Sequence, residues 1–172
     1  MALAQILVGG NDHFAKGGVK SIEIAAYSAG GQNFFIGANN VATTSTLAAA
    51  GDIKKIQFKK ESASIQATSS NDRGKGLYTY EIVIEGYIPN ITSSELDALQ
   101  KLVQETLVAK VYTWEGTNYL VGWNAITSNS SSECDHPLEL TSFVLNSGSG
   151  LSDENGATAT FTCIQPAPPA TF

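Results

Sequence analysis

The sequence is poor in charge, in cysteine and in long apolar runs. Charged residues make up 15% of its 172 residues, whereas about 25% is usual for soluble domains. Ten Lys and Arg against sixteen Asp and Glu leave a net charge of −6, which disfavours binding of the chain as a whole to nucleic-acid phosphates. Two cysteines, Cys134 and Cys163, are too few for a disulfide scaffold, so we expect free thiols.

No apolar run reaches the ~18 residues that a membrane-spanning helix needs, and residues 1–10 lack the cationic start of a secretory signal. We therefore expect a protein made in the cytoplasm, with no membrane partner. At roughly 150 residues per domain, the length fits one domain over residues 1–172.

Strand signals with a two-residue period dominate the chain. The segment 78–88 is the clearest, with Tyr80, Ile82 and Ile84 on one face and Glu81 and Glu85 opposite. The turn-rich stretch 69–76 joins it to a strand predicted over 53–68, which indicates a long antiparallel hairpin. The other expected strands cover residues 19–26, 107–114, 118–123, 138–146 and 157–164.

One amphipathic helix is predicted over residues 93–105. Thr92 followed three residues later by Glu95 is a capping box, and Leu96, Leu99 and Val103 recur at helical spacing. The expected fold is mainly β, an antiparallel sandwich or barrel with this single flanking helix. We expect the core to contain Ile22, Ile24, Ile56, Phe58, Tyr80, Ile82, Ile84, Leu96, Leu99, Val103, Val111, Val121, Phe143 and Phe161.

Three stretches carry weak strand signals. Residues 1–18 and the proline-rich residues 165–172 are expected to be extended arms, and residues 30–51 a long loop. Within that loop Phe34, Phe35 and Ile36 form an apolar group among Gly and Asn residues. A contiguous apolar patch commonly marks an interface, so we predict contacts between subunits there.

No group of residues supports catalysis, a cofactor or a metal. Cys134, Asp135 and His136 are close in sequence, but they fall in a Ser-rich loop that offers no orienting partner. They also lack the ligand spacing of a metal site, even with His13 added. Four lysines between residues 54 and 60 are best explained as a solvated strand edge protected against aggregation.

The order of these segments resembles tail tube proteins of tailed bacteriophages, in particular those from phages of Bacteroides-like hosts. The resemblance covers residues 17–164 and is carried by the strand pair with Phe58 and Tyr80, the helix, and two motifs. The motifs are Gly116-Thr117-Asn118-Tyr119-Leu120-Val121-Gly122 and Asp153-Glu154-Asn155-Gly156-Ala157-Thr158-Ala159-Thr160-Phe161. The Ser-rich loop 127–133 and the proline-rich end depart from the family pattern.

The resemblance implies a virion protein that assembles into stacked homohexameric rings and lets the genome pass through. Its partners would be copies of itself and other tail proteins, without specific nucleic-acid binding, and Glu81 and Glu85 would face the lumen. A tail terminator, a baseplate hub ring or a capsid decoration protein is the alternative within the virion. A carbohydrate-binding β-sandwich that uses Tyr112, Trp114, Tyr119 and Trp123 is the alternative from another class.

Overall fold

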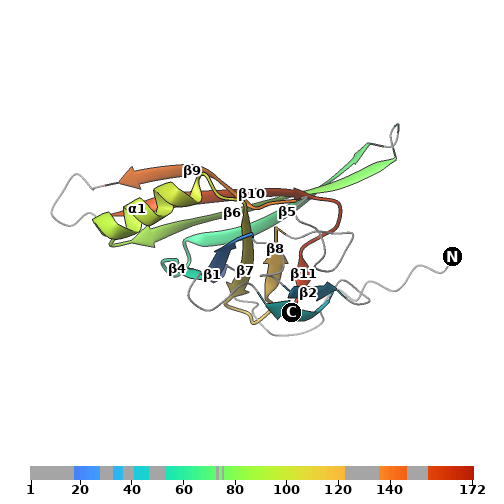
Figure 1. The fold of residues 1–172 in the computed structure, drawn as a ribbon, viewed down its shortest axis with the longest axis horizontal. Coiled ribbons are helices and arrows are strands. Elements are labelled where there is room, and N and C mark those ends of the chain that lie inside the picture. The colour runs from blue at the N-terminus through green and yellow to red at the C-terminus, as the bar shows by residue number, and fades with distance from the viewer. Residues whose placement is uncertain are drawn as a thin grey trace.

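The computed structural model describes residues 18–27, 33–36, 41–46, 53–72, 74, 76–122, 136–146 and 155–172. These residues form β-strands and a single α-helix (Figure 1). The elements in chain order are β1 (Val19–Ala26), β2 (Asn33–Ile36), β3 (Ala42–Thr46), β4 (Lys54–Gln57), β5 (Ala63–Asp72), β6 (Leu77–Pro89), α1 (Ser93–Leu102), β7 (Leu107–Thr113), β8 (Tyr119–Val121), β9 (Glu139–Asn146), β10 (Gly156–Gln165) and β11 (Ala170–Thr171).

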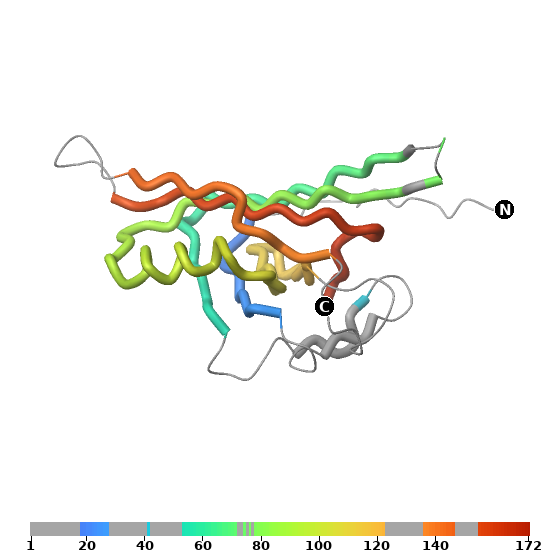
Figure 2. Tube along the Cα trace, turned by 45° about the horizontal axis from the view of Figure 1, so that its top comes forward, coloured from blue at the N-terminus to red at the C-terminus, as the bar shows by residue number. Residues whose placement is uncertain are grey.

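Two antiparallel sheets build the body of the fold. The five-stranded sheet has the order β11-β8-β7-β1-β4, and the four-stranded sheet has the order β5-β6-β10-β9. Figure 2 shows the long strands of the four-stranded sheet on one side of the molecule, with α1 and the five-stranded sheet on the other side. The mainly-β, sandwich-like prediction is confirmed, and the sheets are not closed into a barrel.

The core lies between the two sheets because the inward positions of their strands are apolar. Ile22 and Ile24 of β1 face Ile82 and Ile84 of β6, and all four are fully buried together with Phe161. Burying a side chain of this size stabilises a fold by about 1.5–3 kcal/mol. The predicted core residues that are buried are Ile22, Ile24, Phe58, Ile82, Ile84, Leu99, Val111, Val121 and Phe161, whereas Ile56, Tyr80, Leu96 and Phe143 are partly buried.

The helix begins where its capping box predicts. The Thr92 hydroxyl accepts from the Glu95 backbone N–H at 3.3 Å, and the Glu95 carboxylate accepts from the Thr92 N–H at 2.7 Å. The helix ends at Leu102 rather than at residue 105, and Val103, predicted to be in the core, is 58% exposed because it follows the last turn. Leu99 anchors the helix as its buried residue.

The segment 53–68 is two strands rather than the single strand predicted. Its first part is β4 at the edge of the five-stranded sheet, and its second part is β5 at the edge of the four-stranded sheet. The chain crosses between the sheets with Glu61 at a φ of 64°, and Phe58 enters the core at the crossing. The predicted long hairpin is therefore formed by β5 and β6 alone.

The C-terminal residues differ from the extended arm predicted for 165–172. Gln165 still belongs to β10, and Ala170 and Thr171 form β11, which pairs with β8. Gln165 and Ala170 are buried, so this segment packs on its own chain. Of the two other weakly patterned stretches, residues 1–17 lie outside the described residues, and the described part of 30–51 contains the hairpin of β2 and β3.

Candidate functional site

The four-stranded sheet turns one face away from the five-stranded sheet, and we name it the acidic face. Strand alternation sends Ile82 and Ile84 into the core and therefore Glu81 and Glu85 to the opposite, exposed face. Thr162 of β10 is in register with Glu139 of β9 on this same face. Thr158 and Thr160 lie along it as well. The exposed Ile164 is in register with Glu81, and the exposed Val144 with Thr158, so the surface combines polar and acidic side chains with two aliphatic ones.

The charge on this sheet has one sign. The sequences of β5, β6, β9 and β10 contain Asp72, Glu81, Glu85 and Glu139 but neither lysine nor arginine. A cation-free acidic surface repels phosphate and gives a polyanion no site for counterion release. The predicted lumen residues Glu81 and Glu85 thus share a surface with Glu139, which the sequence analysis did not single out.

Both edge strands of the four-stranded sheet carry little charge, namely Asp72 at the end of β5 and Glu139 at the start of β9, and neither contains a lysine. Within the described residues, β5 pairs only with β6, and β9 pairs only with β10. From Ala63 to Asn71 β5 has no charged residue, and β9 exposes Val144 and Leu145 at 58% and 50%. In contrast, the edge strand β4 carries Lys54 and Lys55, the usual safeguard against edge-to-edge association.

The hairpin of β5 and β6 extends beyond the body of the molecule (Figure 1). β10 accompanies β6 only as far as Tyr80, so the outer residues 77–79 of β6 pair with β5 alone. Tyr78 in this part is 62% exposed. A two-stranded ribbon without a core behind it is marginally stable by itself, so we name residues 69–79 the hairpin arm and treat it as a contact surface.

The predicted interface residues Phe34, Phe35 and Ile36 lie in β2. This strand pairs with β3 in a separate two-stranded sheet, with Phe34 opposite Ser45 and Phe35 opposite Thr44. Their side chains are not among those that the structure describes, so the prediction of subunit contacts at this position stays a prediction.

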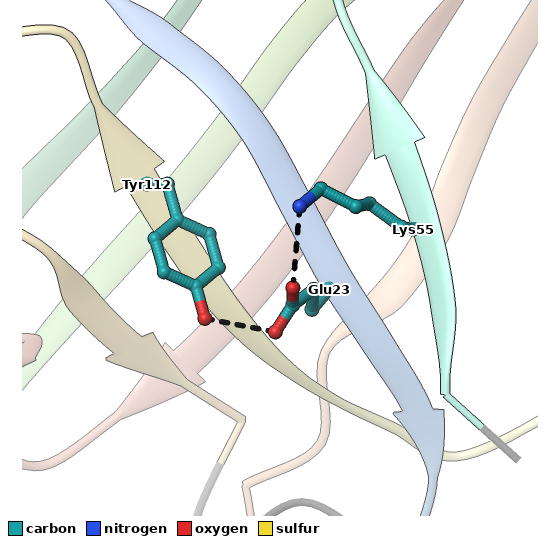
Figure 3. Close-up of polar contacts among 3 residues, drawn as sticks. All are labelled: Glu23, Lys55 and Tyr112. Carbon is teal, nitrogen blue, oxygen red and sulfur yellow. Dashed lines mark hydrogen bonds and ion pairs between the residues drawn. The ribbon is translucent and has the colours of Figure 1, made fainter. Parts of the chain in front are cut away.

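The outward face of the five-stranded sheet carries a polar cluster that joins three strands (Figure 3). Glu23 of β1 lies between Lys55 of β4 and Tyr112 of β7. Its carboxylate is 3.5 Å from the Lys55 ammonium and accepts a hydrogen bond of 2.8 Å from the Tyr112 hydroxyl. Desolvation, followed by this hydrogen bond and by the negative charge of Glu23, raises the pKa of Tyr112 to about 12.

Two further lysine–aromatic pairs extend this cluster along the sheet. The Lys110 ammonium lies 5.0 Å from the ring centroid of Phe172, and the Lys20 ammonium lies 5.5 Å from that of Trp114. Desolvation lowers the pKa of Lys110 below its ordinary value of 10.5, and the charge of Glu23 opposes this shift. We name this surface the lysine face, which comprises Lys20, Glu23, Lys55, Lys110, Tyr112, Trp114 and Phe172.

An open groove of about 480 Å³ separates β4 from α1. Ile56, Ile88, Leu99 and Leu102 supply much of its apolar lining. Phe58 and Leu99 are buried beside it, so the groove follows the seam at which the helix closes one side of the sandwich.

Of the residues weighed for catalysis, the structure describes His136. The His136 Nδ1 is 3.1 Å from the carbonyl oxygen of Ile164, and the Cys163 thiol donates to the carbonyl oxygen of His136 at 3.4 Å. His13, Cys134 and Asp135 lie outside the described residues. Within the part of the chain that is described, no three His, Cys, Asp or Glu side chains come together as metal ligands do.

The four aromatic residues of the carbohydrate alternative do not share one platform. Tyr119 packs against the inner core, whereas Tyr112 is on the lysine face, bonded to Glu23. Trp114 is 39% exposed, and Trp123 lies outside the described residues. Among the described residues no helix is both long and apolar enough to span a membrane.

Comparison with known proteins adds no relative: no family model, no curated protein and no solved structure matches this chain. Any functional conclusion therefore depends on the surfaces themselves. Sequence analysis missed the lysine face because its pairs join residues far apart in the chain. It also missed the full charge of the acidic face, although the missing cations of four strands can be counted from the sequence.

Proposed function

We propose that this chain is a structural subunit of a bacteriophage virion, namely the tail tube subunit. Copies of it would form homohexameric rings that stack into the conduit for DNA ejection. One observation carries this proposal: among the described residues, the four-stranded sheet has two open edge strands that contain one acid each and no lysine, and one acidic face without cations. A monomer gains nothing from open edges, whereas a ring uses both of them.

Ring closure follows from the two edges. Because β5 and β9 are at opposite edges of one sheet, β5 of one subunit can pair with β9 of the next, and repetition around an axis leaves no free edge. The half-exposed Val144 and Leu145 would then be covered by the neighbouring subunit. Pairing also satisfies backbone N–H and C=O groups that an open edge leaves to water.

A ring closed in this way joins the four-stranded sheets into one wall. We infer that the acidic face lines the lumen, so that Glu81, Glu85 and Glu139 point toward the DNA. Phosphates are repelled by these carboxylates, and the four strands themselves contain no lysine or arginine to hold them, so the genome can slide. With the opposite orientation the acidic face would have no such use.

Stacking of rings needs a heterologous contact, in which one surface of a subunit binds a different surface of the subunit in the next ring. The hairpin arm at residues 69–79 projects from one end of the molecule (Figure 1). A head-to-tail contact of this kind repeats without closing and makes a filament. Residues 1–18 and the 30–51 region, with Phe34, Phe35 and Ile36, are the other stacking contacts that we propose.

The experiment compares assembly of the wild type with two double variants of equal charge. Val144→Lys/Leu145→Lys places cations on the open β9 edge, whereas Gln57→Lys/Gln100→Lys places them on the already charged β4 edge and on the helix. We expect rings and tubes in electron micrographs of the wild type and the control variant, and monomers for the β9 variant.

Three outcomes would count against the proposal. A wild type that stays monomeric at high concentration contradicts ring formation altogether. Single rings or trimers that never stack favour the terminator, hub or decoration alternative. Tubes formed equally well by the β9 variant would show that β5–β9 pairing does not close the ring.

A further inference from the structure

The charges of the two large sheets are segregated. All charged residues in the strands of the four-stranded sheet are acidic. The five strands of the other sheet instead contain one acid, Glu23, and four lysines, namely Lys20, Lys54, Lys55 and Lys110. In a chain with a net charge of −6, this concentration of lysine on one sheet is a local reversal of sign. The lysine face occupies part of the outward side of that sheet, next to a second apolar cluster in which Ala25, Val108, Leu120 and Ala170 are buried.

The lysines on this face each lie beside an aromatic ring, while Lys20 and Lys55 remain exposed to solvent. Each ammonium lies 5.0–5.8 Å from the centroid of an aromatic ring that neighbouring elements supply, a geometry in which the ring attracts the cation. An ordered charge loses less side-chain entropy when it binds. The three pairs are Lys20 with Trp114, Lys55 with Tyr112, and Lys110 with Phe172.

The face has too few carboxylates for its lysines. Both oxygens of Glu23 are engaged, one with Lys55 and the other with the Tyr112 hydroxyl. Among the described residues neither Lys20 nor Lys110 has a carboxylate within ion-pair distance. Lys110 is also half-buried, and its cross-strand neighbour Glu23 favours its ammonium form. Because Glu23 serves Lys55 and Lys110 together, the three lysines of the face outnumber its one carboxylate, and a carboxylate brought by a partner would offset this excess of positive charge.

We propose that the lysine face is the docking surface of an acidic protein partner, one that brings aspartate or glutamate side chains to Lys20 and Lys110. Trp114 and Phe172 provide apolar area between the charges, and aromatic residues of this kind are enriched in protein interfaces. The partner covers the side of the subunit opposite to the acidic face.

A nucleic acid fits this surface less well. Glu23 lies in the middle of the face, where it repels a continuous line of phosphates. The overall charge of −6 opposes approach of a long polyanion, whereas a short acidic segment can place each carboxylate separately. This inference uses only the contacts within one chain, so it goes beyond the tail tube proposal and stands or fails independently of it.

The test is binding of a fluorescently labelled peptide of alternating Glu and Gly, measured by anisotropy at low salt. Lys20→Gln/Lys55→Gln/Lys110→Gln removes the face, and Lys54→Gln/Lys60→Gln/Lys101→Gln removes the same charge from exposed lysines elsewhere. We expect the first triple variant to bind about tenfold more weakly than the wild type, and the second to lose clearly less.

Thermal melts establish that both triple variants are folded, and NMR shifts of the wild type with the peptide should centre on Tyr112 and Phe172. Absence of peptide binding to the wild type overturns the proposal, and so does an equal loss in the two variants. A DNA duplex that binds more tightly than the peptide, with the same dependence on the three lysines, would make the face a nucleic-acid surface instead. None of these outcomes depends on ring assembly.

Discussion

Contact between Phe58 and Gly86 should control how the two sheets close on each other at the crossing between β4 and β5. Phe58 is buried, and its ring covers the backbone of Gly86 in β6. A methyl group added at Gly86 would lie 2.4 Å from the Phe58 Cδ1 and 2.7 Å from the Ala63 Cβ, whereas carbon atoms in contact are about 3.5–4.0 Å apart. Gly86→Ala therefore overfills the core, which typically costs about 1–3 kcal/mol.

A double-mutant cycle tests whether the loss of unfolding free energy in Gly86→Ala comes from its contact with Phe58. Phe58→Ala should cost about 3–5 kcal/mol because it leaves a cavity, and that cavity receives the methyl group of Gly86→Ala. Gly86 has no positive φ, and Ala is favoured over Gly inside a strand by roughly 0.5–1 kcal/mol. In the Phe58→Ala background we therefore expect Gly86→Ala to be less destabilising by about 1–2 kcal/mol, with Ala63 limiting the rescue.

Urea unfolding of the four proteins, followed by tryptophan fluorescence under conditions where the chain is monomeric, measures the cycle. In a chain of this size each kcal/mol corresponds to a shift of about 2–4 °C in Tm, so thermal melts check the order of stability. A cost of Gly86→Ala that is the same with and without the Phe58 ring would refute the reasoning. It would mean that β6 moves away from Phe58 as a unit.

Three further predictions concern charge. Hydrogen bonds from the backbone N–H and then the hydroxyl of Thr92 lower the pKa of Glu95 below its ordinary value of 4.5. The ionised Glu95 therefore stabilises the fold above pH 4.5, and this stabilisation is lost as the pH falls through the pKa of the folded state. Thermal melts should show Glu95→Gln differing from the wild type at pH 7 but not in acid, with Glu105→Gln as an unaffected control. Tyr112, with its pKa at about 12, should stay protonated at pH 11 in NMR spectra. The hydrogen bond of its hydroxyl to Glu23 stabilises the fold at pH values below about 10, and this stabilisation is lost as the pH rises from there through about 12. Glu23→Gln should lower the pKa of Tyr112. The variant Glu81→Lys/Glu85→Lys should be retained on a column of immobilised duplex DNA and released by salt. The variant Glu105→Lys/Glu115→Lys, which has the same change in charge, should pass through that column.

Local signals in the sequence were sufficient for several elements. The two-residue alternation from Val19 predicted β1 with its observed bounds, and Thr92 with Glu95 predicted the start of α1. These predictions succeeded because the decisive interactions are between neighbours in the chain. The acidic face was partly predictable for the same reason, since Glu81 and Glu85 alternate with the buried Ile82 and Ile84.

The predictions that failed depend on distant contacts. The crossing within 53–68 uses a positive φ at Glu61 rather than at a glycine, so no turn signal marks it. β11 is two residues long and exists only because β8 lies beside it. Glu139 was missed because exposed and buried positions in β9 do not alternate cleanly: the register shifts where Ser142 and Leu140 of β9 face the consecutive residues Thr160 and Phe161 of β10.

Salt should act in opposite directions on the two surfaces that this chain presents. The proposed ring would bring copies of Glu81, Glu85 and Glu139 toward one axis, where their mutual repulsion would oppose assembly. Added salt screens charges over about 8 Å at physiological ionic strength, so rings should form more readily as salt increases. Docking of acidic side chains on Lys20 and Lys110 is attractive, so the same salt should weaken it. A salt series on one preparation, with ring assembly followed by mass photometry and peptide binding by anisotropy, therefore separates the two proposals. If assembly and peptide binding both strengthened or both weakened with salt, one of the two surfaces would have been assigned to the wrong kind of contact.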